Sequence, residues 1–330
     1  MKKIFALLLS AALLVTLLAA CGGTTTTDTD TDAQEPATDA STTQTEEQEP
    51  DTGDASKDDP LNQDEIGEKE LLVVSFGTSY NDSRRETIGA IEKAMQTAFP
   101  DYSVRRAFTS QIIIDHVKDR DGVTIDNVEQ ALERAVNNGV KTLVVQPTHL
   151  MNGLEYEELT DELAKYSDSF EKIAIGDPLL TSDADFEAVM TAITDATKDA
   201  ADGKTAICFM GHGTTADSNS VYSKMQTLLT DKGFNDYYVG TVEATPSLDD
   251  VLAAVQKGSY EKVVLRPLMI VAGDHANNDM AGDEDDSWKS TFEKAGYTVD
   301  CQVEGLGQLE AIQQLFVEHA KAAVASAEAE

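Results

Sequence analysis

Cysteine is scarce in this chain of 330 residues, which has only Cys21, Cys208 and Cys301. Three cysteines with no CxxC pair exclude a disulfide-rich scaffold and a cysteine-ligated zinc site. Cys208 lies inside the apolar segment ICFM and is expected in the core, whereas Cys301 follows the strand-like segment YTVD. Whether these two cysteines form one bridge stays open at the level of sequence.

Basic residues are also few. The chain has 25 Lys and Arg against 60 Asp and Glu, which gives a formal net charge of −35. This acidity argues against a nucleic acid or an anionic surface as the partner, because both would repel the chain.

Several catalytic signatures are missing. The sequence has no GxxxxGK[ST] loop, no GxGxxG after a strand and no GxSxG turn. These patterns mark ATP sites, dinucleotide sites and serine nucleophiles, so nothing in the sequence indicates any of the three.

The N-terminal residues have the pattern of an export signal. Lys2 and Lys3 precede the apolar run 4–18, and small residues lead to Cys21. This pattern predicts a secretory signal over residues 1–21. The segment LAACG also resembles the bacterial lipobox, whose cysteine becomes the lipidated first residue, so we expect an extracytoplasmic protein anchored to the bacterial membrane by a lipid at Cys21. The alternative is an uncleaved membrane anchor.

Residues 22–69 are rich in Thr, Asp, Glu, Gln and Pro. Such a segment cannot bury enough apolar surface to offset its conformational entropy. We therefore predict a disordered acidic tether here, and favour this reading over capture of metal by its carboxylates.

The rest of the chain alternates strand-like and helix-like patterns. Apolar runs predict strands over 71–76, 103–107, 142–146, 172–175, 205–210, 237–241, 262–267 and 297–301. Helical periodicity is clearest over Ser83–Phe99, Asp126–Asn137 and Leu309–Ala325. The alternation predicts an α/β fold of two halves, 70–200 and 201–330, each a parallel four-stranded sheet flanked by helices.

The two halves also resemble each other. In order, VVSFGTS, VRRAFTS and VVQPTHLMNGLE of the first half align with ICFMGHG, VGTVEAT and VLRPLMIVAGDH of the second. This order favours an internal duplication with facing halves. The alignment sets His212 opposite Thr78, Glu243 opposite Phe108 and His275 opposite Glu155.

The candidate site follows from the ends of the predicted strands. His212 and His275 occupy glycine-flanked turns after buried strands, where ligands collect in α/β sheets. With Glu243 they form a set of two histidines and one carboxylate, which suits Co, Ni, Fe or Zn. A neutral imidazole can also accept a proton, and Glu155 is the natural second carboxylate across the cleft. The competing interpretation makes the histidines ordinary turn residues and Glu155 one of several acids that begin a helix.

The other three histidines are weaker candidates. His149 follows a buried strand, where it either touches a ligand or hydrogen-bonds within its loop. We expect His116 at a helix end and His319 on a solvated helix face. Arg105, Arg106 and Arg266, near strand ends, are weak candidates for binding ligand carboxylates.

Five motifs carry a resemblance to a known family: LLVVSFGTSYNDS, RRAFTSQIII, FMGHGT, VGTVEATP and PLMIVAGDHANNDMAGDEDDSWK. From about Glu70 to Ala320 the chain resembles the anaerobic cobalt chelatases, which insert Co(II) into sirohydrochlorin without ATP. The resemblance implies two α/β halves with the active site between them. It also implies that His212, Glu243 and His275 bind the metal, that His212 accepts a proton, and that Glu155 is a further active-site carboxylate.

The resemblance leaves the physiological role open. It implies a lyase of cobalamin biosynthesis whose substrates are a tetrapyrrole and a divalent metal. Co(II) is the expected metal, with Fe(II) or Ni(II) as alternatives, and no other cofactor is implied. Sirohydrochlorin is made in the cytoplasm, however, and exported relatives work with haem or iron. The alternative is a membrane-anchored lipoprotein that binds metal or a haem-like metallo-tetrapyrrole for uptake, with an import permease or a second copy of itself as partner.

Overall fold

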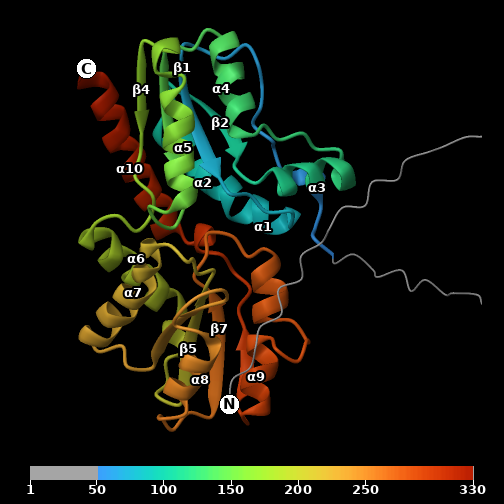
Figure 1. Ribbon diagram of the computed structural model, residues 1–330, viewed down its shortest axis with the longest axis vertical. Coiled ribbons are helices and arrows are strands. Elements are labelled where there is room, and N and C mark those ends of the chain that lie inside the picture. Colours follow the sequence, from blue (N-terminus) through green and yellow to red (C-terminus); the bar gives the residue numbers. More distant parts are fainter. Residues whose placement is uncertain (1–50, 330) are drawn as a thin grey trace, which may run out of the picture. The chain divides into compact units, whose positions relative to one another are not determined.

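Two parallel four-stranded sheets form the centre of the computed structural model, which describes residues 51–329 (Figure 1). The first sheet has the order β2-β1-β3-β4 and consists of β1 (Lys69–Ser75), β2 (Ser103–Phe108), β3 (Thr142–Pro147) and β4 (Lys172–Ile175). The second has the order β6-β5-β7-β8 and consists of β5 (Thr205–Gly211), β6 (Tyr237–Thr241), β7 (Lys262–Pro267) and β8 (Thr298–Cys301). The predicted fold class is confirmed, and the equivalent strands of the two halves hold the same places in their sheets.

Burial on both faces explains why the central strands read as unbroken apolar runs. In β1, Leu71 pairs with Val104 on one side and Val144 on the other, and all three side chains are buried. In β5, Cys208 pairs with Leu265 of β7, while Cys301 lies one strand further out. Helices cover both faces of such a sheet, so little polarity is tolerated in its middle strands. Cys208 and Cys301 are both free thiols.

Ten α-helices connect or flank the strands within residues 51–329. They are α1 (Asn81–Glu86), α2 (Ile88–Ala98), α3 (Gln111–Asp121), α4 (Val128–Asn137), α5 (Leu154–Ala164), α6 (Asp183–Thr197), α7 (Ser220–Asp231), α8 (Leu248–Val255), α9 (Trp288–Lys294) and α10 (Glu310–Ala329). Short turns of other helix types are η1 (Ala55–Lys57), η2 (Ser167–Ser169), η3 (Lys198–Ala200), η4 (Asp217–Asn219), the π-turn η5 (Ala276–Met280) and η6 (Leu306–Gln308). None of the helices in this part of the chain is long and apolar enough to cross a bilayer.

The prediction of one helix over Ser83–Phe99 is wrong, because the helix divides at Thr87 into α1 and α2. Thr87 has φ −111° and ψ −76°, and its hydroxyl donates back to the carbonyl of Ser83 at 2.6 Å. Gly307 also packs so closely that a Cβ on it would lie 2.8 Å from the Cβ of Thr87. Local side-chain bonding and this close approach override the helical periodicity.

The last helix crosses between the halves. α10 follows the second half in sequence, yet it packs on β3 and β4 of the first sheet (Figure 1). Its residues Phe316 and Val317 share one buried cluster with Val144 of the first sheet and Phe209 of the second. Conversely, α6, which belongs to the first half, packs beside α7 of the second half. Each half therefore contributes a helix to its neighbour, and one core runs through both.

Residues 51–68, which we call the strap, are ordered, so the predicted disordered tether is wrong for this stretch. Leu61 is buried, and its carbonyl accepts the amide N–H of Arg106 at 3.2 Å. Asp58 contacts the buried guanidinium groups of Arg84 and Arg106 at 2.6 and 2.7 Å. Buried arginines need a counter-charge, and the strap supplies it. The rest of the predicted tether, the predicted signal over residues 1–21 and Cys21 lie outside the described residues.

Candidate metal centre

A cleft of about 680 Å³ opens where the strand ends of the two sheets meet. Its walls come from the loops after β1 and β3 of the first half and after β5, β6 and β7 of the second. The lining is mostly apolar, with Phe76, Leu154, Met269 and Ile270 among its members, and Phe76 and Leu154 are exposed. Such a space suits a flat, largely apolar ligand.

His212 follows β5 directly, and its neighbours must be glycine. A Cβ on Gly211 would lie 2.1 Å from the ring of Tyr222, and Gly213 has φ +89°. The Nδ1 of His212 lies 2.8 Å from the carbonyl oxygen of Gly213. A carbonyl only accepts, so Nδ1 carries the proton and Nε2 keeps a free lone pair. The turn thus presents Nε2 as a ligand or a base.

His275 precedes the π-turn η5, whose Ala276 and Met280 are buried and fix the turn to the core. Its Nδ1 lies 2.8 Å from a carboxylate oxygen of Asp279, one turn further along the chain. The carboxylate accepts the Nδ1 proton, so Nε2 is again the free nitrogen. A carboxylate behind a ligating histidine fixes the ring orientation and makes the nitrogen more basic.

Glu243 is held beside His212 by backbone pairing that continues past β6. The amide of Val242 donates to the carbonyl of Gly211 at 3.0 Å, and that of Glu243 donates to the carbonyl of His212 at 2.9 Å. The carboxylate of Glu243 then lies 4.0 Å from His212 Nε2. Both side chains remain about half exposed, at 49% and 57%, so the pair is open to incoming ions.

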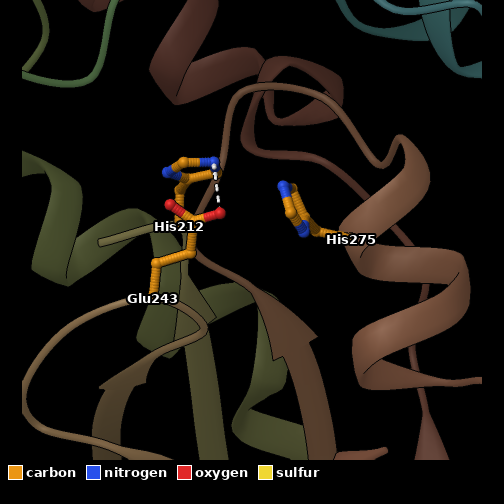
Figure 2. A group of neighbouring side chains, drawn as sticks. All are labelled: His212, Glu243 and His275. Carbon is orange, nitrogen blue, oxygen red and sulfur yellow. Dashed lines mark ion pairs between the residues drawn. The ribbon is translucent and has the colours of Figure 1, made fainter. Parts of the chain in front are cut away.

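The three side chains converge (Figure 2). One ligand atom from each of His212, Glu243 and His275 lies within 4.8 Å of the other two, and the two imidazole rings meet edge to face at 4.7 Å between centroids. Two nitrogens and one carboxylate oxygen on one side, with the cleft on the other, are an open set of ligand atoms that could hold a divalent transition metal. The sequence predicted these three residues as a set, and the structure brings them together.

Glu155 lines the same cleft from the first half, at the start of α5. Burial raises the pKa of its carboxyl group, and the nearby His212 partly lowers it. A carboxylate on the opposite wall with a raised pKa is suited to exchanging protons. Tyr222 also lines the cleft, and its hydroxyl accepts the amide N–H of Gly213 at 3.3 Å.

His149 also lines the cleft, but as a buried group that is only 5% exposed. Neither ring nitrogen has a hydrogen-bond partner, so the alternative in which it bonds within its own loop is wrong. Burial lowers its pKa to about 4, which keeps the ring neutral near pH 7. His149 is not part of the three-residue group.

The remaining histidine predictions are wrong. His116 lies in the middle of α3 rather than at a helix end. His319 is not solvated, because its ring contacts a carboxylate oxygen of Asp185 at 3.0 Å and the carbonyl oxygen of Asp177 at 3.1 Å, and its side chain is only 11% exposed. These contacts arise because α10 packs against the first half, which the helical pattern did not reveal.

The arginine candidates are wrong as well. Arg105, Arg106 and Arg266 are buried and contact Asp126, Glu92 and Glu304 respectively, at 2.7 to 3.1 Å. They stabilise the sheets and do not line the cleft. The sequence also missed the role of Asp279, although its place four residues after His275 was a usable signal.

Two facing α/β halves, with a cluster of metal-ligand residues at the strand ends of one, define a chelatase-type architecture. The fold is similar to that of SirB from Bacillus subtilis, solved with Fe3+, with a TM-score of 0.57 over 80% of this chain and 98% of that one at 14% identity.

The sequence comparisons are more specific. Residues 69–325 match the family model for cobalt chelatase (CbiK). The chain is 38% identical to the sirohydrochlorin cobaltochelatase of Salmonella typhimurium, over 76% of this chain and 94% of that protein. It is 30% identical to sirohydrochlorin cobaltochelatase CbiKC of Nitratidesulfovibrio vulgaris, over 78% and 91%. The chain belongs to the cobalt chelatase family.

Proposed function

We propose that this protein is an ATP-independent chelatase that inserts Co(II) into sirohydrochlorin or a related tetrapyrrole. The observation that carries the proposal is the convergence of His212, Glu243 and His275 at the edge of a mostly apolar cleft of about 680 Å³. Membership of the cobalt chelatase family supports the same chemistry. Co(II) is the substrate metal, and Fe(II) and Ni(II) suit the same nitrogen and oxygen ligands.

The chemistry divides into binding the metal and removing protons. The free Nε2 atoms of His212 and His275 and the carboxylate of Glu243 hold the ion at the cleft wall and offset part of its charge. A tetrapyrrole in the cleft then presents its ring nitrogens to the ion, and two pyrrole N–H protons must leave as the metal enters. As the metal passes from the protein to the ring, Nε2 of His212 becomes free, and this nitrogen can then accept one proton while Nδ1 keeps its hydrogen bond to Gly213.

Glu155 is the second group that can exchange protons. It stands on the wall of the first half, facing the metal-binding wall, and burial raises the pKa of its carboxyl group. No Lys or Arg of the described residues lines the cleft. The carboxylates of the tetrapyrrole would therefore meet backbone amides and the hydroxyls of Ser79, Thr214 and Ser218, or project into water.

Export is the second part of the proposal. The signal-like residues 1–21 and the lipobox-like cysteine support a chelatase held at the outer face of a bacterial membrane by a lipid at Cys21. That location also favours a second candidate function, a lipoprotein that captures a metal or a haem-like metallo-tetrapyrrole for an import permease.

Turnover distinguishes the two functions. Purified protein is incubated with excess sirohydrochlorin and Co(II), and formation of the cobalt complex is followed by absorbance. The His212→Ala variant is measured in the same way. Conversion of many equivalents by the parent protein and loss of most activity in the variant support the chelatase. A spectral change that stops at one equivalent supports the binding lipoprotein, and full activity of His212→Ala would show that this histidine is not the base.

A further inference from the structure

The strap, residues 51–68, lies before the part of the chain that matches the family, which begins at residue 69. It is nevertheless packed into the first half. Leu61 is buried, Asn62 donates to the carbonyl of Thr124 at 2.9 Å, and Asp64 pairs with Arg134 at the same distance. The strap is thus an addition to the family domain that packs against it, and its contacts show which part of the domain it can influence.

Its most buried charge is Asp58, whose side chain is 3% exposed. One carboxylate oxygen accepts from Arg84 at 2.6 Å and from Arg106 at 2.7 Å, and the other accepts from Arg106 at 3.0 Å. Arg106 also binds Glu92 at 2.7 Å. Two buried cations thus face two buried anions. Without Asp58, Arg106 would keep Glu92 but Arg84 would lose its carboxylate partner, which is unfavourable for a buried cation.

Arg84 connects this cluster to the cleft. Its guanidinium is fully buried and donates to Asp58, to Asn81 at 2.6 Å and to the backbone carbonyl of Thr78 at 3.1 Å. The planar fork of arginine allows these three bonds at once. Thr78 belongs to the loop 76–79 after β1, all of which lines the cleft.

The loop 76–79 in turn touches the loop that carries a candidate metal ligand. The hydroxyl of Thr78 would lie 3.1 Å from a Cβ on Gly273, two residues before His275. On the same side, the Oγ of Ser83 in α1 accepts the amide N–H of Ala272 at 3.0 Å. Asp58, Arg84 and Thr78 therefore form a continuous series of contacts from the strap to the cleft wall.

We propose that the strap is a working part of the site: Asp58, acting through Arg84, is a positioning residue that holds the loop 76–79 in the shape that receives the tetrapyrrole. The inference rests on the proposed function and adds to it a contribution from outside the family domain. Because the loop forms the wall and supplies no metal ligand, its displacement affects binding of the macrocycle more than the later steps.

The test uses the full chain with Asp58→Asn and, as a control from the same segment, Asp64→Asn, which removes an exposed ion pair. Arg84→Lys is the second variant, because it keeps a cation beside Asp58 but cannot make the three bonds of the fork. Circular dichroism first establishes a temperature at which each variant is folded. KM for sirohydrochlorin, kcat and the visible spectrum of bound Co(II) are then measured.

We expect KM for sirohydrochlorin to rise about tenfold in Asp58→Asn and Arg84→Lys, with kcat and the Co(II) spectrum nearly unchanged and Asp64→Asn like the parent. A purely structural role would lower the active fraction and leave KM alone. If Asp58→Asn folds and its KM is unchanged, the inference is overturned while the chelatase proposal stays intact. If Asp58→Asn does not fold, the KM of Arg84→Lys decides the inference by the same criterion.

Absence of turnover in the parent would instead reject the proposed function. The inference is then decided by the dissociation constant of sirohydrochlorin from an absorbance titration, with the same weakening of about tenfold expected. If the parent does not bind the ring, the inference fails together with the function.

Discussion

The hydrogen bond at Nδ1 decides what each histidine of the centre can do. His212 donates to the carbonyl of Gly213 and His275 to the carboxylate of Asp279, so both present an unprotonated Nε2 to the same point. The two partners differ in charge. In the proposed chelatase, the carboxylate would make His275 the more strongly donating metal ligand, whereas the neutral partner of His212 would leave His212 better suited to pass a proton on.

Asp279→Asn tests this division. The change keeps the size of the side chain but removes the charge behind His275, so we expect Co(II) affinity to fall about 10- to 100-fold. Titration with Co(II) followed by visible absorbance measures the loss. Asp283→Asn, an exposed acid of the same loop paired with Lys289, is the control and should bind as the parent does. Equal affinity of Asp279→Asn and the parent would contradict the assigned role.

His149 gives a prediction about pH. Its pKa is about 4 in the folded protein, because of burial, against about 6.5 in the unfolded chain. The unfolded chain therefore binds the proton first, and stability is lost as pH falls from about 6.5 to about 4, by at most about 3 kcal/mol. Above about pH 6.5, the titration of His149 no longer changes the stability of the protein.

His149→Met, which introduces the residue found at the aligned position 269, should flatten the free energy of unfolding between pH 6.5 and 4 relative to the parent. Urea unfolding at a series of pH values measures this. His116→Gln, a change at an exposed position, should leave the parent profile as it is. Parallel profiles for His149→Met and the parent would show that the ring is not held neutral.

At the scale of elements, the join between α1 and α2 depends on a close approach. Gly307, beside η6, packs so tightly on Thr87 that an added Cβ would lie 2.8 Å from its Cβ and 2.9 Å from its Cα. Because a backbone atom cannot move aside as a side chain can, the contact leaves no space for a methyl group. This is the same point at which the predicted single helix breaks.

Gly307→Ala should lower the free energy of unfolding by about 1–3 kcal/mol, as overpacking does elsewhere. Gly67→Ala is the matched control, since nothing lies within 4 Å of a Cβ there. Chemical denaturation of both variants measures the difference. Equal stability of the two would mean that η6 can move away from Thr87 at little cost.

The strands and the clustering of His212, Glu243 and His275 were predictable from sequence because their signals are local. A buried parallel strand is an apolar run, and His212 and His275 follow such runs within two glycine-marked turns. The strap was not predictable, since its composition matches that of residues 22–50 and the contacts that bury Asp58 come from Arg84 and Arg106, which are distant in sequence. His319 and the three buried arginines were misread for the same reason, because long-range packing determines their partners.

For the whole molecule, the charge of −35 predicts a response to salt. Self-repulsion of a strongly acidic chain favours the unfolded state, and salt reduces the Debye length from about 30 Å at 0.01 M to about 8 Å at 0.15 M. The midpoint of thermal unfolding should therefore rise over this range of NaCl. Near pH 4.5, about the ordinary pKa of Glu, the increase should shrink as carboxylates become protonated. A midpoint that falls with NaCl at pH 7 would show that attractive ion pairs dominate.

The duplication in the sequence predicted two similar halves. It did not predict that each half would pack a helix against the other, since the sequence of α10 does not indicate which sheet the helix covers. The position of α10 on β3 and β4 bears on how the chain is made. Synthesis runs from the N-terminus, so the face of the first sheet that α10 covers stays bare until α10 leaves the ribosome, after all the strands of the second half. The nascent chain therefore cannot complete the packing of its first half before α10 has been made.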